Sequence, residues 1–228
     1  PNLSFIAACN PYRLRDSHHM FTKGLKGKLS EDALSLLAYR VHPLPEMMLD
    51  FVWDYGSLPL QEERAYIQRM VKSETFYVHK DVLIQLLAAS QQFVREKEGS
   101  SCTVSLRDVN RCIQLIKWFK DEFLPQQHPE IEEEEVYLRS FIMGLTICYL
   151  CRFSNSEDRL AYRERLTAVF SSNFIDRFTE KEIARCVREE HNTILDKMDV
   201  PRGTARNTAL SENIFVMLVC ILHRLPLF

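Results

Sequence analysis

The spacing of hydrophobic residues along the chain predicts a mostly helical protein. From about residue 46 onward, apolar side chains recur every three or four positions, which is the period of an amphipathic helix. Serine or threonine followed three residues later by an acidic residue marks a helix start at Ser105 and at Thr179. Only six glycines in 228 residues also favour helices over sandwiches or barrels. We expect helices over 47–55, about 60–72, 80–97, 105–119, 132–152, 157–170, 180–198 and 208–223.

Short apolar runs near the two ends of the chain predict a few strands. Residues 3–9 and 38–44 have the composition of short buried strands, and residues 224–228 look like the beginning of another. Asn10 and Pro11 close the first run, because proline has no N–H and favours an extended predecessor. The predicted fold is therefore mainly α with a few short strands, in which a partial α/β core precedes the helices.

Composition and charge place the chain among ordinary globular proteins. A hydrophobic content of 46% and a charged content of 26% are typical of that class. The net charge of −2 gives no global case for nucleic-acid binding. Seven cysteines, mostly inside apolar runs, favour reduced thiols in a cytosolic protein. No signal peptide is visible, and the longest apolar run, 214–222, is shorter than the roughly 18 residues of a membrane span.

Asn10 is the first candidate for chemistry. It follows a very apolar predicted strand, and open α/β sheets bind ligands at the carboxyl ends of their strands. A carboxamide at that place can accept a hydrogen bond from a water and donate one to a phosphate oxygen. The alternative is an asparagine that only caps a turn.

Arg107 is the second candidate. It lies in the first turn of the helix that begins after Ser105, where a cation is unfavourable for the helix dipole. The guanidinium group offers a planar fork of donors that suits phosphate oxygens. The alternative is a surface ion pair between Arg107 and an aspartate or glutamate.

Cys148 and Cys151 have the spacing of a metal-binding pair. A zinc site needs a second pair of ligands, and the nearby candidates, Cys186 and His191, are expected on a different helix. Two small core residues one helical turn apart are the favoured interpretation, and no metal is expected in this chain. The chain also has no G-x-x-x-x-G-K-[ST] loop and no apolar strand that ends in Asp-Glu.

The order of these motifs resembles part of an AAA+ module. The apolar strand ending in Asn10 comes first, then Tyr-Arg-Val-His-Pro-Leu-Pro at 39–45, and then Ser-Leu-Arg-Asp-Val-Asn-Arg at 105–111. This series is similar to AAA+ units of the mysterin family, whose members are giant AAA+ ATPases and RING-type E3 ubiquitin ligases. Residues 207–228 are similar to the segment that leads into the phosphate-binding loop of the next unit in that family, whereas 126–200 match only loosely.

The resemblance implies roles for three residues. Asn10 resembles sensor 1, which orients the attacking water, and Arg107 resembles sensor 2, which reaches the γ-phosphate of ATP. Arg40 lies where several AAA+ families place an arginine finger, which stabilises charge on the transferring phosphoryl group; a solvated arginine at a strand edge is the alternative. ATP with magnesium is bound by the parent unit, and zinc belongs only to the parent's RING domain. The chain alone is not expected to be catalytic.

The resemblance also implies a division of the chain. Residues 1–56 correspond to the C-terminal part of one AAA+ core, and 57–125 to its small helical lid. The stretch Pro125–Pro129 is expected to be a linker. Residues 130–205 then form a helical connection between units, and 206–228 start the next core.

The expected function is to sense ATP and to couple adjacent AAA+ units in a protein with ubiquitin ligase activity. The implied partners are neighbouring AAA+ units of the same chain and, through the parent, a ubiquitin-conjugating enzyme and protein substrates. Neither nucleic acid nor a transmembrane segment is expected. The implied location is the cytosol, with lipid-droplet association as a further expectation for the family. The alternatives are a non-catalytic helical scaffold and a clamp-loader-type unit that handles DNA, which the lack of a basic stripe disfavours.

Overall fold

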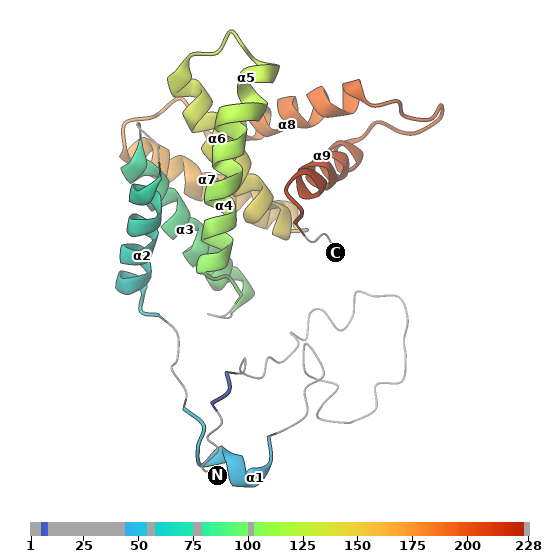
Figure 1. Cartoon of the computed structure of the whole chain (residues 1–228). Coiled ribbons are helices and arrows are strands. Elements are labelled where there is room, and N and C mark those ends of the chain that lie inside the picture. Colours follow the sequence, from blue (N-terminus) through green and yellow to red (C-terminus); the bar gives the residue numbers. More distant parts are fainter. Residues whose placement is uncertain (1–5, 9–43, 54–57, 75–78, 100–102, 226–228) are drawn as a thin grey trace. The chain divides into compact units, whose positions relative to one another are not determined.

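The computed structural model describes residues 6–8, 44–53, 58–74, 79–99 and 103–225 (Figure 1). The chain forms two compact units, Pro1–Gly56 and Ser57–Phe228. Nearly all of the described residues belong to the second unit, and this unit holds the packed core.

The described part of the first unit contains one short helix, α1 (Glu46–Leu49). It begins after Pro45 and ends in a turn, in which the Phe51 N–H donates to the Met48 carbonyl at 3.1 Å. The helix is therefore much shorter than the expected 47–55. Its apolar side chains are exposed, with Met47 at 84% and Trp53 at 81%.

The predicted α/β core is not seen, because no strand or sheet occurs anywhere in the described residues. Residues 6–8 of the expected first strand have irregular backbone, and Ile6 is fully exposed. Of the expected second strand, only Leu44 is described, and it is not in a strand. The prediction of strands from these short apolar runs was wrong wherever the structure describes them.

The backbone at Arg224 ends a helix where a strand was expected. Arg224 has a φ of 52°, in the left-handed region. The Leu225 N–H donates to the Cys220 carbonyl at 2.8 Å, and the Arg224 N–H to the Ile221 carbonyl at 3.3 Å. These two bonds form a Schellman motif, which satisfies the last carbonyls of the preceding helix. The chain at residues 224 and 225 is thus a helix C-cap.

The second unit is built from helices, and each helix predicted there is present within a few residues of its expected bounds. In chain order they are α2 (Leu60–Ser73), α3 (Lys80–Glu98), α4 (Leu106–Trp118), a π-helical turn (Phe119–Phe123), α5 (Leu124–Gln127), α6 (Glu133–Cys148), a 3₁₀ turn (Leu150–Arg152), α7 (Ser156–Ser172), α8 (Glu180–Lys197) and α9 (Thr208–Leu222).

Side-chain caps explain where several helices begin. Ser105 and Asp108 form the predicted capping box at the start of α4. Thr179 caps α8, and its Oγ1 accepts a hydrogen bond from the Glu182 N–H at 3.3 Å. Asn207 caps α9, and its Oδ1 accepts from the Leu210 N–H at 2.8 Å. Each cap satisfies a backbone donor that the helix itself leaves unpaired.

The stretch expected to be a linker, Pro125–Pro129, is partly helical. The chain passes from α4 through the π-helical turn into α5, which contains Pro125 near its start. In the π-helical turn, the Leu124 N–H donates to the Phe119 carbonyl. Proline is tolerated at a helix start because its missing N–H would have had no partner there. This part of the linker prediction was wrong for that reason.

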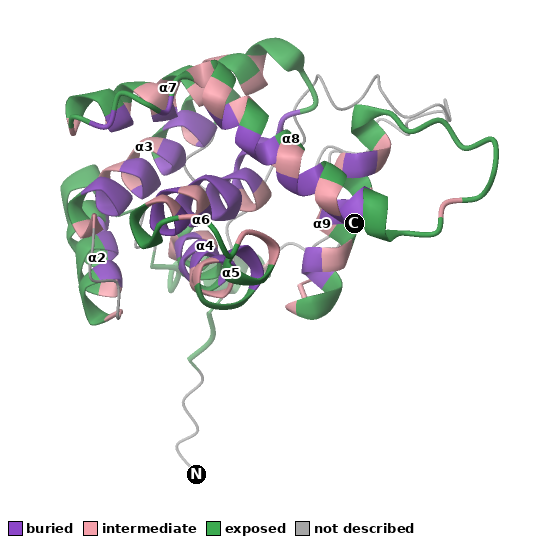
Figure 2. Cartoon of the chain, turned by 90° about the horizontal axis from the view of Figure 1, so that it is seen from above, coloured by how far each residue is buried: buried purple, intermediate pink, exposed green. Residues whose placement is uncertain are grey.

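Helix α6 lies at the centre of the second unit. A continuous run from Phe141 to Thr146 is buried, so the helix is covered on all sides (Figure 2), as expected for a helix that is apolar all round. It packs closely on α4, because Gly144 has no Cβ and a side chain there would collide with Ile116.

The remaining helices surround this pair. Helix α3 packs against α2, α6 and α7, and α8 packs against α6, α7 and α9. None of the helices in the described residues has the length and hydrophobicity needed to cross a bilayer. The arrangement brings α7, α8 and the start of α9 together around a cavity, which is described below.

Candidate functional site

Two of the three predicted site residues, Asn10 and Arg40, lie outside the described residues. Their roles stay predictions from the sequence. Arg107 is described, and its surroundings can be examined directly.

Arg107 is the second residue of α4 and its side chain is exposed. Its N–H donates to the Ser105 Oγ at 3.3 Å. Its guanidinium group forms no hydrogen bond or ion pair with any other described residue. The neighbouring Asp108 accepts from the Ser105 N–H at 2.8 Å and pairs with Arg111 at 3.7 Å. The surface ion pair considered as an alternative for Arg107 is therefore not formed within the described part of the chain.

A buried ion pair fixes the loop that precedes α4. Arg95 of α3 donates two hydrogen bonds of 2.6 Å to Glu63 of α2. Glu63 is only 5% exposed. Arg95 also donates to the Val104 carbonyl at 3.3 Å. Bidentate arginine–carboxylate pairs are strong and directional, so this pair ties α2, α3 and the start of α4 together.

A buried amide adds a second anchor to the same loop. The Gln91 Nε2 donates to the Ser105 carbonyl at 3.2 Å and to the Tyr149 hydroxyl at 3.0 Å. Gln91 and Tyr149 are both fully buried, and burial raises the pKa of Tyr149 well above its usual value. Arg152 donates to the Thr103 carbonyl at 3.2 Å. The backbone on which Arg107 stands is thus held by α3 and by the chain after α6.

Cys148 and Cys151 have no set of metal ligands grouped around them among the described residues. The described residues contain no group of three or more histidine, cysteine, aspartate or glutamate side chains arranged to hold a metal ion. Burial raises the pKa of Cys151 to about 12, and it also raises the pKa of Cys112, whose thiol is hydrogen-bonded to Cys148. The Cys112 and Cys151 thiols stay protonated at neutral pH. Cys148 and Cys151 are half-buried side chains of the helical core, as in the interpretation favoured from the sequence.

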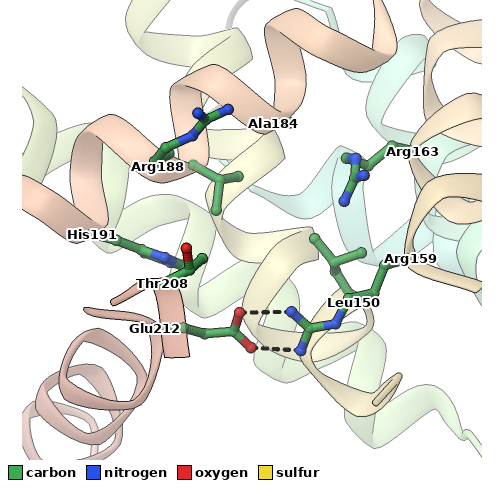
Figure 3. Close-up of a pocket in the computed structure, with 9 residues that line it drawn as sticks. Leu150, Arg159, Arg163, Ala184, Arg188, His191, Thr208 and Glu212 are labelled. Carbon is green, nitrogen blue, oxygen red and sulfur yellow. Dashed lines mark hydrogen bonds and ion pairs between the residues drawn. The ribbon is translucent and has the colours of Figure 1, made fainter. Parts of the chain in front are cut away.

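The structure contains a cavity, lined by apolar and charged side chains, that the sequence did not reveal. It has a volume of about 250 Å³ and lies where α7, α8 and α9 meet (Figure 3). The side chains that line it are Leu150, Arg159, Arg163, Ala184, Val187, Arg188, His191, Thr208 and Glu212.

One wall of the cavity is an ion pair between α7 and α9. Arg159 donates two hydrogen bonds of 2.6 Å to the two carboxylate oxygens of Glu212 (Figure 3). Arg159 also donates to the Phe153 carbonyl at 2.5 Å. The hydrogen bonds from Arg159 lower the pKa of Glu212, although burial acts in the opposite direction. The pair fixes both groups in their charged forms at neutral pH.

The other polar groups of the cavity are less completely paired. His191 is only 3% exposed, and its Nε2 has no hydrogen-bond partner in the described residues. Burial lowers the pKa of His191 to about 4, so the ring is neutral at physiological pH. Arg163 pairs with Glu180 at 2.7 Å. The exposed Arg188 has no carboxylate partner among the described residues.

This cavity escaped prediction because three separate helices build it. The signal in the sequence was the spacing of Arg159 and Arg163 at i and i+4, and of Arg188 and His191 at i and i+3. Such spacing places each pair on one helix face. It does not say that the two faces meet.

Comparison with known proteins finds similar sequences. No family model matches the chain. The chain is 35% identical over 250 residues to the zebrafish (Danio rerio) protein E3 ubiquitin-protein ligase rnf213-beta. It is 32% identical over 256 residues to mouse E3 ubiquitin-protein ligase RNF213 and 32% identical over 257 residues to the human protein of that name.

Each of these matches covers 99% of this chain, which spans only 5% of the length of the curated relatives. The alignments therefore include residues 126–200, for which the sequence motifs gave only a loose match. Over nearly its whole length, the chain is homologous to one short segment of RNF213 (mysterin), and the family resemblance seen in its motifs is confirmed.

Proposed function

We propose that this chain is a nucleotide-sensing and coupling segment of a mysterin-type E3 ubiquitin ligase. The observation that carries the proposal is the match over 99% of the chain to proteins named as E3 ubiquitin-protein ligases. On this proposal the parent works in the cytosol with a ubiquitin-conjugating enzyme and protein substrates, and its RING domain holds the zinc. This chain contributes to the use of ATP and magnesium, not to ubiquitin transfer.

Arg107 is the described residue that fits nucleotide sensing. Its helix end is held by the capping box and by Gln91 and Arg95, while its guanidinium group is exposed. A cation in the first turn opposes the helix dipole, and a phosphate oxygen beside it removes that cost and accepts the fork of donors. On the same proposal, Asn10 orients the attacking water and Arg40 serves a neighbouring site.

The packing of the second unit supports a coupling role. The anchors of the loop before α4 connect that loop to α2 and α3, and α4 packs against the central α6. Helix α6 contacts α8, which in turn contacts α9. A displacement of Arg107 towards the γ-phosphate is therefore transmitted through packed helices to the end of the chain.

The test is Arg107→Ala in the full-length parent, compared with Arg69→Ala. Arg69 is a matched control because it is exposed on α2 and has no partner among the described residues. We expect Arg107→Ala to slow ATP turnover at least about tenfold, since a lost donor to a developing phosphate charge is costly, whereas Arg69→Ala keeps the normal rate. Equal turnover in the two variants would refute the sensor assignment.

A non-catalytic scaffold is the second candidate function. It is favoured by the exposed apolar side chains of α9, with Ile221 at 67% and Leu222 at 56%. A scaffold predicts that Arg107→Ala changes neither turnover nor nucleotide affinity. The double substitution Ile221→Ser and Leu222→Ser would instead disturb assembly of the parent. The two candidates therefore make opposite predictions for ATP turnover in Arg107→Ala.

A further inference from the structure

The cavity between α7, α8 and α9 has a positive lining. Its lining contains three guanidinium groups, those of Arg159, Arg163 and Arg188, and one carboxylate, that of Glu212, which pairs with Arg159 (Figure 3). Glu180 lies outside the lining, pairs with Arg163 and offsets the positive charge of that arginine. A net positive charge remains, and Arg188 carries the guanidinium that no described carboxylate neutralises. The lining therefore favours an anion.

His191 contributes a buried polar atom to the lining of this cavity. A buried polar atom without a partner costs about 1–3 kcal/mol, and such atoms call for an explanation. The Nε2 of His191 is such an atom, on a side chain that is 97% buried and lines the cavity. The ring packs against Phe215, with the ring centroids 4.7 Å apart, so this contact holds the ring in its place on the lining.

The two cavity groups without a partner among the described residues, Arg188 and His191, come from one helix. Arg188 and His191 lie three residues apart on α8, so they share a face of that helix. Arg163 reaches the same cavity from α7. Figure 3 shows His191 and Thr208 on one side of the cavity and Arg163 on the other. The volume of about 250 Å³ is sufficient for one compact group.

We propose that this cavity binds the oxyanion end of a small molecule, a phosphate or a carboxylate group. Arg188 and Arg163 supply the charge-assisted hydrogen bonds, for which a guanidinium fork is well suited. His191 completes the site through Nε2, which donates to an anionic oxygen or accepts from a protonated one, according to the tautomer. The bidentate Arg159–Glu212 pair keeps the far wall in place. This site is independent of the proposed role of Arg107.

Calorimetric titration of the 228-residue chain tests the proposal, with inorganic phosphate and citrate as separate probes. Sodium chloride at matched ionic strength is the control for non-specific attraction. Arg188→Gln removes the unpaired charge from the cavity. Arg185→Gln is its matched control, because it removes one charge from the same helix one turn away, at a side chain that pairs with Glu189 at 2.6 Å.

The site is supported if either probe binds and two conditions hold. Arg188→Gln should weaken that binding about tenfold or more, and Arg185→Gln should leave the affinity within about twofold of normal. This size corresponds to one hydrogen bond between charged groups. Binding of phosphate alone assigns a phosphate-bearing ligand, and binding of citrate alone assigns a carboxylate. His191→Phe is the second variant. It fills the ring volume without the nitrogen, and we expect it to weaken the same probe about tenfold.

The proposal is overturned by any of three results. The first is no heat from either probe up to about 10 mM, because that places the affinity beyond the millimolar range. The second is equal weakening by Arg188→Gln and Arg185→Gln, which would mean general attraction to a basic helix. The third is normal binding in both Arg188→Gln and His191→Phe.

Discussion

Arg107 and Arg188 are both exposed arginines without a carboxylate partner among the described residues, yet their surroundings differ. Around Arg107, every buried polar group that fixes the backbone is paired, from the Glu63–Arg95 bridge to the hydrogen bonds of Gln91. Around Arg188, a cavity is present, and the Nε2 of the buried His191 has no hydrogen-bond partner in the described part of the chain.

The difference lies in whether the buried polar groups around the exposed arginine are already paired within the protein. A fully paired network makes a rigid platform, and its arginine needs a partner from beyond the described residues. An incompletely paired lining leaves hydrogen-bonding capacity inside the fold, and that capacity fits a ligand that enters it. We therefore assign positioning to the residues around Arg107 and binding to the residues around Arg188.

Among the substitutions near Arg107 and Arg188, we expect Glu63→Ala to lower the free energy of unfolding the most. This substitution removes the Glu63 carboxylate from its bidentate pair with Arg95, whose side chain is only 19% exposed. Removing one partner of a buried ion pair is strongly destabilising, so we expect the free energy of unfolding to fall by about 3 kcal/mol in urea denaturation.

Glu96→Ala is the matched control for this loss. Glu96 lies next to Arg95 on α3 and pairs with Arg165 at 3.2 Å, and the side chains of the pair are 40% and 47% exposed. Its removal should change the free energy of unfolding by less than about 0.5 kcal/mol. Equal losses in the two variants would show that the Glu63–Arg95 pair does not act as a rigid anchor.

The dependence of stability on pH tests whether His191, in the cavity lining, is desolvated. Burial lowers the pKa of His191 to about 4 from an ordinary value near 6.5. Between these values, the unfolded chain binds a proton that the folded chain does not, so stability falls as the pH falls. From the size of the shift, the contribution of His191 to this loss is roughly 3 kcal/mol by pH 4.

His191→Phe isolates that contribution. The variant lacks the titrating ring, and we expect it to lose roughly 3 kcal/mol less than the original chain between pH 7 and pH 4, measured by urea denaturation at each pH. At pH 7 its stability should match or exceed that of the original, because an unpaired buried nitrogen has been removed. Parallel pH curves for the two proteins would mean that His191 is not desolvated in the folded chain.

The smallest expected effect belongs to the cap of α4. Ser105→Ala removes the side chain that accepts from the Arg107 N–H, and losing a helix N-cap costs about 1 kcal/mol. Ser154→Ala, at an exposed serine just before α7, is the control and should change stability by less than about 0.5 kcal/mol. A loss no larger than that of the control would mean that the capping box does not hold the start of α4.

The helices could be predicted from the sequence because their signals are local. The 3.6-residue period and the caps at Ser105 and Thr179 placed α4 and α8 within about a residue of their observed starts. The predicted strands rested on short apolar runs, and such runs do not distinguish a strand from a helix end. At Arg224 the run closes a Schellman motif instead.

The sites were predictable to different degrees for the same reason. Arg107 could be proposed from the sequence because its motif lies within seven consecutive residues, 105–111. The Glu63–Arg95 bridge joins residues 32 positions apart, and the Arg159–Glu212 pair of the cavity joins residues 53 positions apart. Only packing brings these residues together. Pro125 suggested a linker, but the chain continues from the π-helical turn into α5, with Pro125 near the start of that helix.

The central claim is that the anchored start of α4 presents Arg107 to the terminal phosphate of a nucleotide. The most direct measurement is the affinity of the full-length parent for ADP and for a non-hydrolysable ATP analogue, with Arg107→Ala and Arg69→Ala. We expect Arg107→Ala to weaken binding of the ATP analogue about tenfold and to leave ADP affinity within about twofold, because the contact is made only to the γ-phosphate. Unchanged affinity for both nucleotides, or an equal loss for both, would contradict it.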